Sequence, residues 1–95
     1  MAIIGFRDER LAALFAGMKP RKRFSADLIA VTQRKLNMLH AAETLDDLRS
    51  PPANRLEALR GDQAGQHSIR VNDQFRLCFV WTGQGASEVE FTDYH

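Results

Sequence analysis

The last three residues of the chain, Asp93, Tyr94 and His95, carry side chains that can take part in acid–base chemistry. An imidazole transfers protons near neutral pH, a phenol donates hydrogen bonds, and a carboxylate orients its neighbours. They close an alternating apolar and polar stretch, residues 87–95, which is typical of a half-buried β-strand. Pairing in a sheet would hold these side chains in place, whereas an ordinary edge strand with a polar end would give them no role. On this tripeptide alone both interpretations stay open.

Other charged residues in the C-terminal half suit the same chemistry: Glu57, Arg60, Arg70 and Arg76. The planar fork of an arginine matches phosphate oxygens, and glutamate and histidine exchange protons. The set is compatible with cleavage of RNA without a metal ion, in which the 2′-hydroxyl attacks the adjacent phosphate and the protein stabilises the charged intermediate. Many protein surfaces contain these residue types, so the types alone do not establish a nuclease.

A short strand and two helices are expected to precede these residues. Residues 3–6 are predicted to form the strand, and apolar residues at helical spacing follow from Asp8. The expected buried side of this first helix holds Leu11, Leu14, Phe15 and Met18. Gly17 and Pro20 are expected to end it.

The second helix is predicted from an N-cap at Ser25 to about Ala42. Its expected buried stripe holds Leu28, Ile29, Thr32, Leu36 and Leu39. Residues 44–49 allow a short helical turn, which the proline pair at 51–52 would stop.

A basic run connects the two helices around Pro20, and it consists of Lys19, Arg21, Lys22 and Arg23. Such a run is most often a solvated loop, but it can also contact phosphate. We therefore keep these residues, together with Arg70, as candidates for RNA contacts, with an acidic protein partner as the other interpretation.

The second half reads as antiparallel strands at residues 56–59, 66–71, 75–81 and 87–95. Asn72 and Asp73 supply a turn, since both residue types tolerate a positive φ. In the third of these strands the apolar residues alternate, so Arg76 should point away from the aromatic face. Two helices and a run of antiparallel strands indicate an α+β domain with the helices on one face of the sheet.

Composition sets limits on the class of protein. A chain of 95 residues predicts one domain, residues 1–95, and 44% hydrophobic residues suffice for a modest core. The net charge of +1 neither favours nor excludes a nucleic-acid partner. Cys78 is expected to be a small core residue, and the three histidines are too far apart in sequence to predict a metal site. With no signal peptide and no long apolar segment, we expect a cytoplasmic protein that does not enter the membrane.

The segments 54–62 and 65–79, with the terminal Asp93-Tyr94-His95, resemble the HigB family of bacterial toxins, part of the RelE-like superfamily. The resemblance implies a RelE-like α+β fold, with two N-terminal helices packed on a small, largely antiparallel sheet. It also implies a ribosome-dependent endoribonuclease that cuts translated mRNA without a cofactor. The expected partners are the ribosome with its mRNA, and a HigA-like helix-turn-helix antitoxin through which the toxin would reach operator DNA.

The resemblance also implies roles for single residues. Arg60 matches a basic position that contacts phosphate, and Arg76 matches the arginine that faces the scissile phosphate. His95 would transfer a proton, Tyr94 would stack or donate a hydrogen bond, and Asp93 would position its neighbours.

Glu57 departs from a well-studied branch of the family that has histidine there. Either Glu57 takes over a proton transfer, or that task rests on His95 and the ribosome.

Two other functions stay open. ParE toxins share the superfamily fold but inhibit DNA gyrase, and they lack the terminal catalytic group. A catalytically weak toxin could also persist mainly as a co-repressor that binds its antitoxin.

Overall fold

The fold is an α+β arrangement in which one five-stranded sheet carries two α-helices, in a computed structural model that describes residues 2–93. The strands are β1 (Ala2–Ile3), β2 (Glu57–Ala58), β3 (Gln66–Arg70), β4 (Phe75–Thr82) and β5 (Gly85–Asp93). The helices are α1 (Glu9–Phe15) and α2 (Ala26–Ala41), with short 3-10 helices η1 (Leu45–Arg49), η2 (Pro52–Asn54) and η3 (Gly61–Gln63). The predicted α+β class is thus confirmed.

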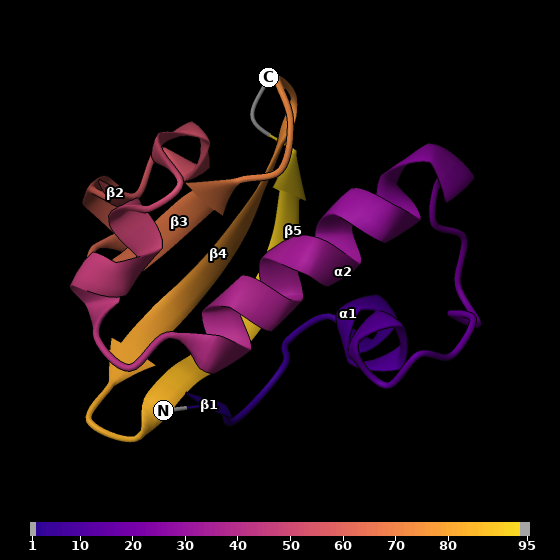
Figure 1. Cartoon of the computed structure of the whole chain (residues 1–95), viewed down its shortest axis with the longest axis horizontal. Coiled ribbons are helices and arrows are strands. Elements are labelled where there is room, and N and C mark those ends of the chain that lie inside the picture. Colours follow the sequence, from indigo (N-terminus) through magenta and orange to yellow (C-terminus); the bar gives the residue numbers. More distant parts are fainter. Residues whose placement is uncertain (1, 94–95) are drawn as a thin grey trace.

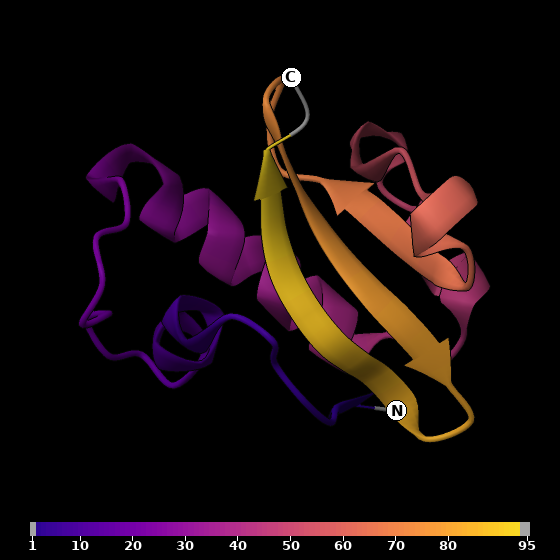
Figure 2. The same cartoon turned by 180° about the vertical axis from the view of Figure 1, so that it is seen from behind.

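The sheet is mixed and has the order β1-β5-β4-β3-β2. Strands β2 to β5 pair antiparallel, as expected, but β1 pairs parallel with β5. The expected description of two N-terminal helices on an antiparallel sheet therefore fits only in part, because a parallel strand precedes both helices. Figure 1 shows α2 crossing in front of β5, and Figure 2 shows the sheet from behind, with α2 passing behind β5 and α1 to the side of that strand.

Helix α1 is shorter than predicted. Asp8 caps its N-terminus by accepting a hydrogen bond from the backbone N–H of Arg10. The helix ends at Phe15, and Gly17 takes a φ of +78° just beyond it. The expectation that Met18 belongs to the buried side is wrong, because the helix has already ended and Met18 is 65% exposed.

Helix α2 confirms most of its predicted stripe. Thr32, Leu36 and Leu39 are fully buried, and Leu28 and Ile29 are half-buried. Ser25 occupies the N-cap position, although its side chain makes no capping hydrogen bond. An unexpected member of the buried set is Lys35, which is only 6% exposed.

Strand β4 lies at the centre of the sheet, and its alternation is as predicted. Leu77 and Phe79 belong to the buried core, and Cys78 is fully buried. The register with β5 pairs Cys78 with Glu90 and Val80 with Ser87, so two β5 residues lie opposite one β4 residue. Glu88 accommodates this bulge with a φ of +51°.

The turn between β3 and β4 forms where expected but in another way. Neither Asn72 nor Asp73 has a positive φ, so that part of the prediction is wrong. The side-chain oxygen of Asn72 instead accepts hydrogen bonds from the backbone N–H groups of Gln74 and Phe75. The side chain thereby closes the turn without a left-handed residue.

An aromatic row supports the last part of β5 from the helix side. The Phe91 ring lies 4.7 Å from that of Phe75 and 4.9 Å from that of Phe24, between centroids. The Arg10 guanidinium lies 5.3 Å from the Phe24 ring, and the Asp8 carboxylate holds it at 2.7 Å. This contact joins the start of α1 to the end of β5.

Within residues 2–93, no helix combines the length and the apolar character that crossing a bilayer requires.

Replacing Gly85 with alanine should destabilise the fold, because a Cβ there would lie 1.9 Å from the carbonyl oxygen of Ala2 in β1 and Gly85 has a φ of +136°. We expect a loss of about 2 kcal/mol or more in the free energy of unfolding, and a fall in Tm of about 10 °C. Thermal and denaturant unfolding followed by circular dichroism measures both. Gly83→Ala is the matched control, since nothing lies within 4 Å of its added Cβ. Equal losses in the two variants would contradict the parallel β1–β5 contact.

Replacing Asp8 with asparagine should remove the ion pair with Arg10 while keeping the helix cap. Burial raises the pKa of Asp8, but hydrogen bonds from Arg10 outweigh it and hold that pKa below the ordinary 3.8. The stabilisation is therefore present above the unfolded pKa and lost as pH falls through the lower folded pKa. We expect the variant to be less stable by about 1 kcal/mol well above the ordinary pKa of 3.8, with the difference shrinking as pH falls below that value.

Denaturant unfolding of both proteins across this pH range measures the difference. Asp46→Asn provides the comparison, because its pair with Arg49 is exposed and should contribute little at any pH. A pH-independent difference for Asp8→Asn would show that the carboxylate charge is not what holds Arg10.

Candidate functional site

The Arg76 guanidinium is the central feature of the candidate site, because it is a buried cation on the central strand. Arg76 is only 8% exposed. Its Nε donates to the Ser68 hydroxyl of β3 at 2.7 Å, and its Nη2 donates to the backbone carbonyl of Arg55. A buried charge needs such partners, and here they come from two different parts of the chain. As the alternation predicted, the side chain leaves β4 on the face opposite Phe75 and Leu77.

Glu57 lies beside this guanidinium. Its Oε2 atom is 3.9 Å from Nη2 of Arg76, and its side chain is 58% exposed. Glu57 pairs with Ser68 across β2 and β3, so the strand register itself brings the carboxylate to the arginine. The site therefore offers a buried cation next to a carboxylate that solvent or a ligand can reach.

Two more arginines stand at the same end of the sheet. Arg70 pairs with Arg76 across β3 and β4, and its guanidinium bonds to the exposed Asp73 carboxylate. Arg55 follows η2 with a φ of +45°. A hollow of about 270 Å³ is lined by Arg55, Arg70, Asn72, Asp73 and Arg76.

The residues of the terminal group are only partly described. Asp93 pairs with Phe75 at the end of β5, next to the pair of Arg76 and Thr92. Its side chain accepts a hydrogen bond from Gln74 at 3.1 Å. By this register Asp93 shares the helix-facing side of the sheet, whereas Arg76 leaves from the other side. Tyr94 and His95 lie outside the residues that the structure describes.

Arg60 stands apart from this group. It is exposed and precedes η3, next to Leu59, which bonds to Gln66 at the start of β3. Arg70 is at the other end of β3, about 13 Å further along the strand. Among residues 2–93 no hydrogen bond or ion pair joins Arg60 to Arg76.

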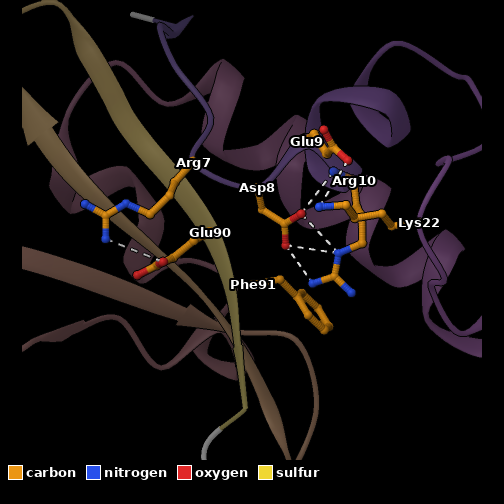
Figure 3. A pocket seen from close by; sticks show the side chains of 7 residues that line it. All are labelled: Arg7, Asp8, Glu9, Arg10, Lys22, Glu90 and Phe91. Carbon is orange, nitrogen blue, oxygen red and sulfur yellow. Dashed lines mark hydrogen bonds and ion pairs between the residues drawn. The ribbon is translucent and has the colours of Figure 1, made fainter.

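The basic run is exposed and lies next to α1. Lys22 is 3.5 Å from Glu9, and the carbonyl of Arg23 accepts from the Arg10 guanidinium at 3.3 Å. A second hollow of about 400 Å³ includes Lys22, Arg10 and Phe91 in its lining. Figure 3 shows Arg10 reaching back to Asp8 next to the Phe91 ring, and Arg7 reaching Glu90. Lys22 thus shares a hollow with Phe91 of β5, whereas Lys19 and Arg21 line another hollow with Glu9, Ala13 and Met18.

Sequence reasoning missed Arg55, although it lies within the segment 54–62. Its left-handed conformation brings its carbonyl to Arg76, and no composition rule predicts such a conformation for an arginine. Lys35 and Asn54, which are joined by a hydrogen bond, were also missed. A buried lysine is rare enough that helical spacing gives no signal for it.

The arrangement has a definite chemical capability. The Arg76 guanidinium is fixed in orientation by its hydrogen bonds to Ser68 and to the Arg55 carbonyl. Arg55, Arg70 and Arg76 line one hollow, which favours an anion such as a phosphodiester. Glu57 adds a group that can accept or return a proton.

Comparison with known proteins identifies the family of the chain. A family model described as the RelE-like toxin HigB of type II toxin–antitoxin systems matches residues 4–95. The chain is 38% identical over 90 residues to Toxin HigB-1 of Vibrio cholerae, covering 95% of this chain and 94% of that toxin. It is 42% identical over 76 residues to an uncharacterised protein of Haemophilus influenzae, covering 80% of this chain and 75% of that protein.

Membership of a toxin–antitoxin family implies an antitoxin as partner. The family model matches nearly the whole chain, including every described residue of the Arg76 group. The chain therefore belongs to the HigB-type, RelE-like toxins of type II toxin–antitoxin systems.

Proposed function

We propose that this toxin is a ribosome-dependent endoribonuclease that cuts translated mRNA and that a HigA-like helix-turn-helix antitoxin neutralises. The observation that carries the proposal is the buried Arg76 guanidinium with the Glu57 carboxylate 3.9 Å away, at the edge of a hollow lined by further arginines. The pair sets a cation that can stabilise phosphoryl charge beside a group that can transfer a proton, and RNA cleavage uses both. Membership of the HigB-type toxins supports the same function.

In the proposed reaction the RNA supplies its own nucleophile. The 2′-hydroxyl loses its proton and attacks the adjacent phosphorus, and the 5′-oxygen leaves with a proton, giving a 2′,3′-cyclic phosphate and a 5′-hydroxyl. Arg76 stabilises the charge that develops on the phosphoryl oxygens. Glu57 and His95 share the two proton transfers, Tyr94 stacks on or bonds to the RNA, and Asp93 positions the terminal residues. No metal ion enters these steps.

The remaining basic residues have binding roles in this proposal. Arg60 and Arg70 contact backbone phosphates on either side of the reacting one. Lys19, Arg21, Lys22 and Arg23 contact ribosomal RNA while the terminal group enters the decoding site. Bound to its antitoxin in the cytoplasm, the toxin would reach operator DNA only through that partner.

Arg76→Lys should lower the rate of mRNA cleavage by about 100-fold or more, because lysine keeps the charge but loses the planar fork. Glu57→Gln and His95→Ala should each lower it by about 100-fold or more if both groups transfer protons. The measurement is single-turnover cleavage of an mRNA on programmed ribosomes, with thermal unfolding of each variant to confirm the fold.

Arg49→Lys is the matched control for this series, because Arg49 is exposed on η1 and pairs with Asp46. It should retain the rate within about twofold. A Glu57→Gln variant that cleaves at the original rate, beside an inactive His95→Ala, would show that the role given to Glu57 is wrong. If the protein inhibits purified gyrase and leaves translation unaffected, the proposed ribonuclease function is wrong and the protein is a gyrase inhibitor.

Neutralising the basic run tests the proposed ribosome contact. A combined Arg21→Gln, Lys22→Gln and Arg23→Gln variant should bind ribosomes more weakly. The slope of the logarithm of the binding constant against the logarithm of the salt concentration should become shallower by about one for each phosphate contact that is lost. Ribosome binding measured between about 50 and 200 mM salt gives both values. Arg49→Gln controls for loss of a surface charge elsewhere. An unchanged slope in the combined variant would place these residues outside the ribosome contact.

A further inference from the structure

In the part of the chain that the structure describes, residues 2–93, the ammonium group of the buried Lys35 has no carboxylate among its hydrogen-bond acceptors. Lys35 of α2 is 6% exposed, and its Nζ donates to the side-chain oxygen of Asn54 at 2.5 Å. Burial lowers the pKa of Lys35, and the nearby charges of Arg34 and Arg70 lower it further. A charged group in such surroundings is costly to keep, so its retention suggests a specific task.

Asn54 transmits the position of Lys35 to the loop before β2. It is fully buried, and its side-chain nitrogen donates to the carbonyls of Leu48 at 3.2 Å and Ser50 at 3.4 Å. The Asn54 amide thus accepts from Lys35 of α2 through its oxygen and donates to backbone carbonyls of η1 and of the η1–η2 connection through its nitrogen. The backbone at residue 54 is held from both directions.

The next residue connects this anchor to the candidate site. Arg55 has φ +45° and ψ +57°, a left-handed conformation that non-glycine residues seldom adopt. In this conformation its carbonyl accepts a hydrogen bond from Nη2 of Arg76, and its own side chain lines the hollow. Relaxation of the loop would move both groups at once.

We propose that Lys35 and Asn54 are positioning residues that hold Arg55 in its left-handed conformation, so that the Arg55 carbonyl orients the Arg76 guanidinium and the Arg55 side chain adds to the phosphate site. This inference rests on the proposed ribonuclease function for its catalytic readout. The positioning of Arg76 by Lys35 does not depend on that function and can be measured without RNA. Ser68 remains as a second acceptor for Arg76, so the effect of losing the anchor is partial.

The test replaces Lys35 with methionine, which fills similar space without the charge, and compares it with Arg34→Met on the same helix, where the residue is exposed. We expect Lys35→Met to lower the single-turnover cleavage rate about tenfold, with the ribosome concentration for half-saturation changed by less than about twofold. Arg34→Met should leave the cleavage rate unchanged. Asn54→Ala should reproduce the pattern of Lys35→Met. A purely structural role would lower the amount of folded protein without changing the rate of the folded fraction.

The second readout does not depend on RNA. In nitrogen-15 NMR of arginine side chains, the Arg76 signal, identified by its loss in Arg76→Lys, should show a guanidinium protected from solvent exchange in the original protein. That protection should fall in folded Lys35→Met and persist in Arg34→Met. Unchanged protection with an unchanged cleavage rate in folded Lys35→Met would overturn the inference. If the original protein cuts no mRNA but the NMR pattern appears as expected, the proposed function fails while the positioning role holds.

Discussion

The burial of one guanidinium on the central strand is the constraint on which the rest of the site depends. Arg76 is 8% exposed, so its guanidinium N–H groups must find acceptors inside the protein. Among residues 2–93 these acceptors include the Ser68 hydroxyl on β3 and the Arg55 carbonyl, with Glu57 of β2 close by. Leaving such a charge unpaired would cost about 3–5 kcal/mol, a large share of the stability of a small domain. The pairing of β2, β3 and β4 and the loop before β2 together place these partners around the cation.

The two faces of the sheet have separate tasks. The helix side carries the core and the aromatic row of Phe24, Phe91 and Phe75, which the pair of Asp8 and Arg10 attaches to α1. The other side carries Arg76, Arg70 and Glu57. Strand β5 connects the two, because its supported end places Asp93 beside the Arg76 pair. The packed face can hold the end of β5 firmly while the charged face remains available to a ligand.

Much of the fold was predictable from local pattern. The stripe on α2 and the alternation of β4 depend on spacing along one element, and both were confirmed. The parallel pairing of β1 with β5 was not predicted, since it joins residues more than 80 positions apart and depends on Gly85 admitting the β1 backbone. Met18 was also placed wrongly from local pattern. Its spacing fitted the buried side of the first helix, but that helix ends at Phe15.

The sequence predicted which residue types the candidate site contains better than it predicted where they lie. Arg76 and Glu57 were chosen for their chemistry and do lie together, whereas Arg60 stands near the opposite end of β3. Arg55, Lys35 and Asn54 gave no signal, because a left-handed arginine and a buried lysine run against the preferences of their residue types. Their positions follow from tertiary contacts with Arg76 and with each other.

The measurement that tests the proposed activity most directly is the mapping of RNA ends in a translation extract that contains the purified toxin. The account predicts new 5′-hydroxyl and 2′,3′-cyclic phosphate ends within the coding region of translated mRNA, and their absence when initiation is blocked. Cuts that appear equally in untranslated RNA would contradict the dependence on the ribosome. Arrested growth with intact mRNA and normal translation would contradict the ribonuclease itself.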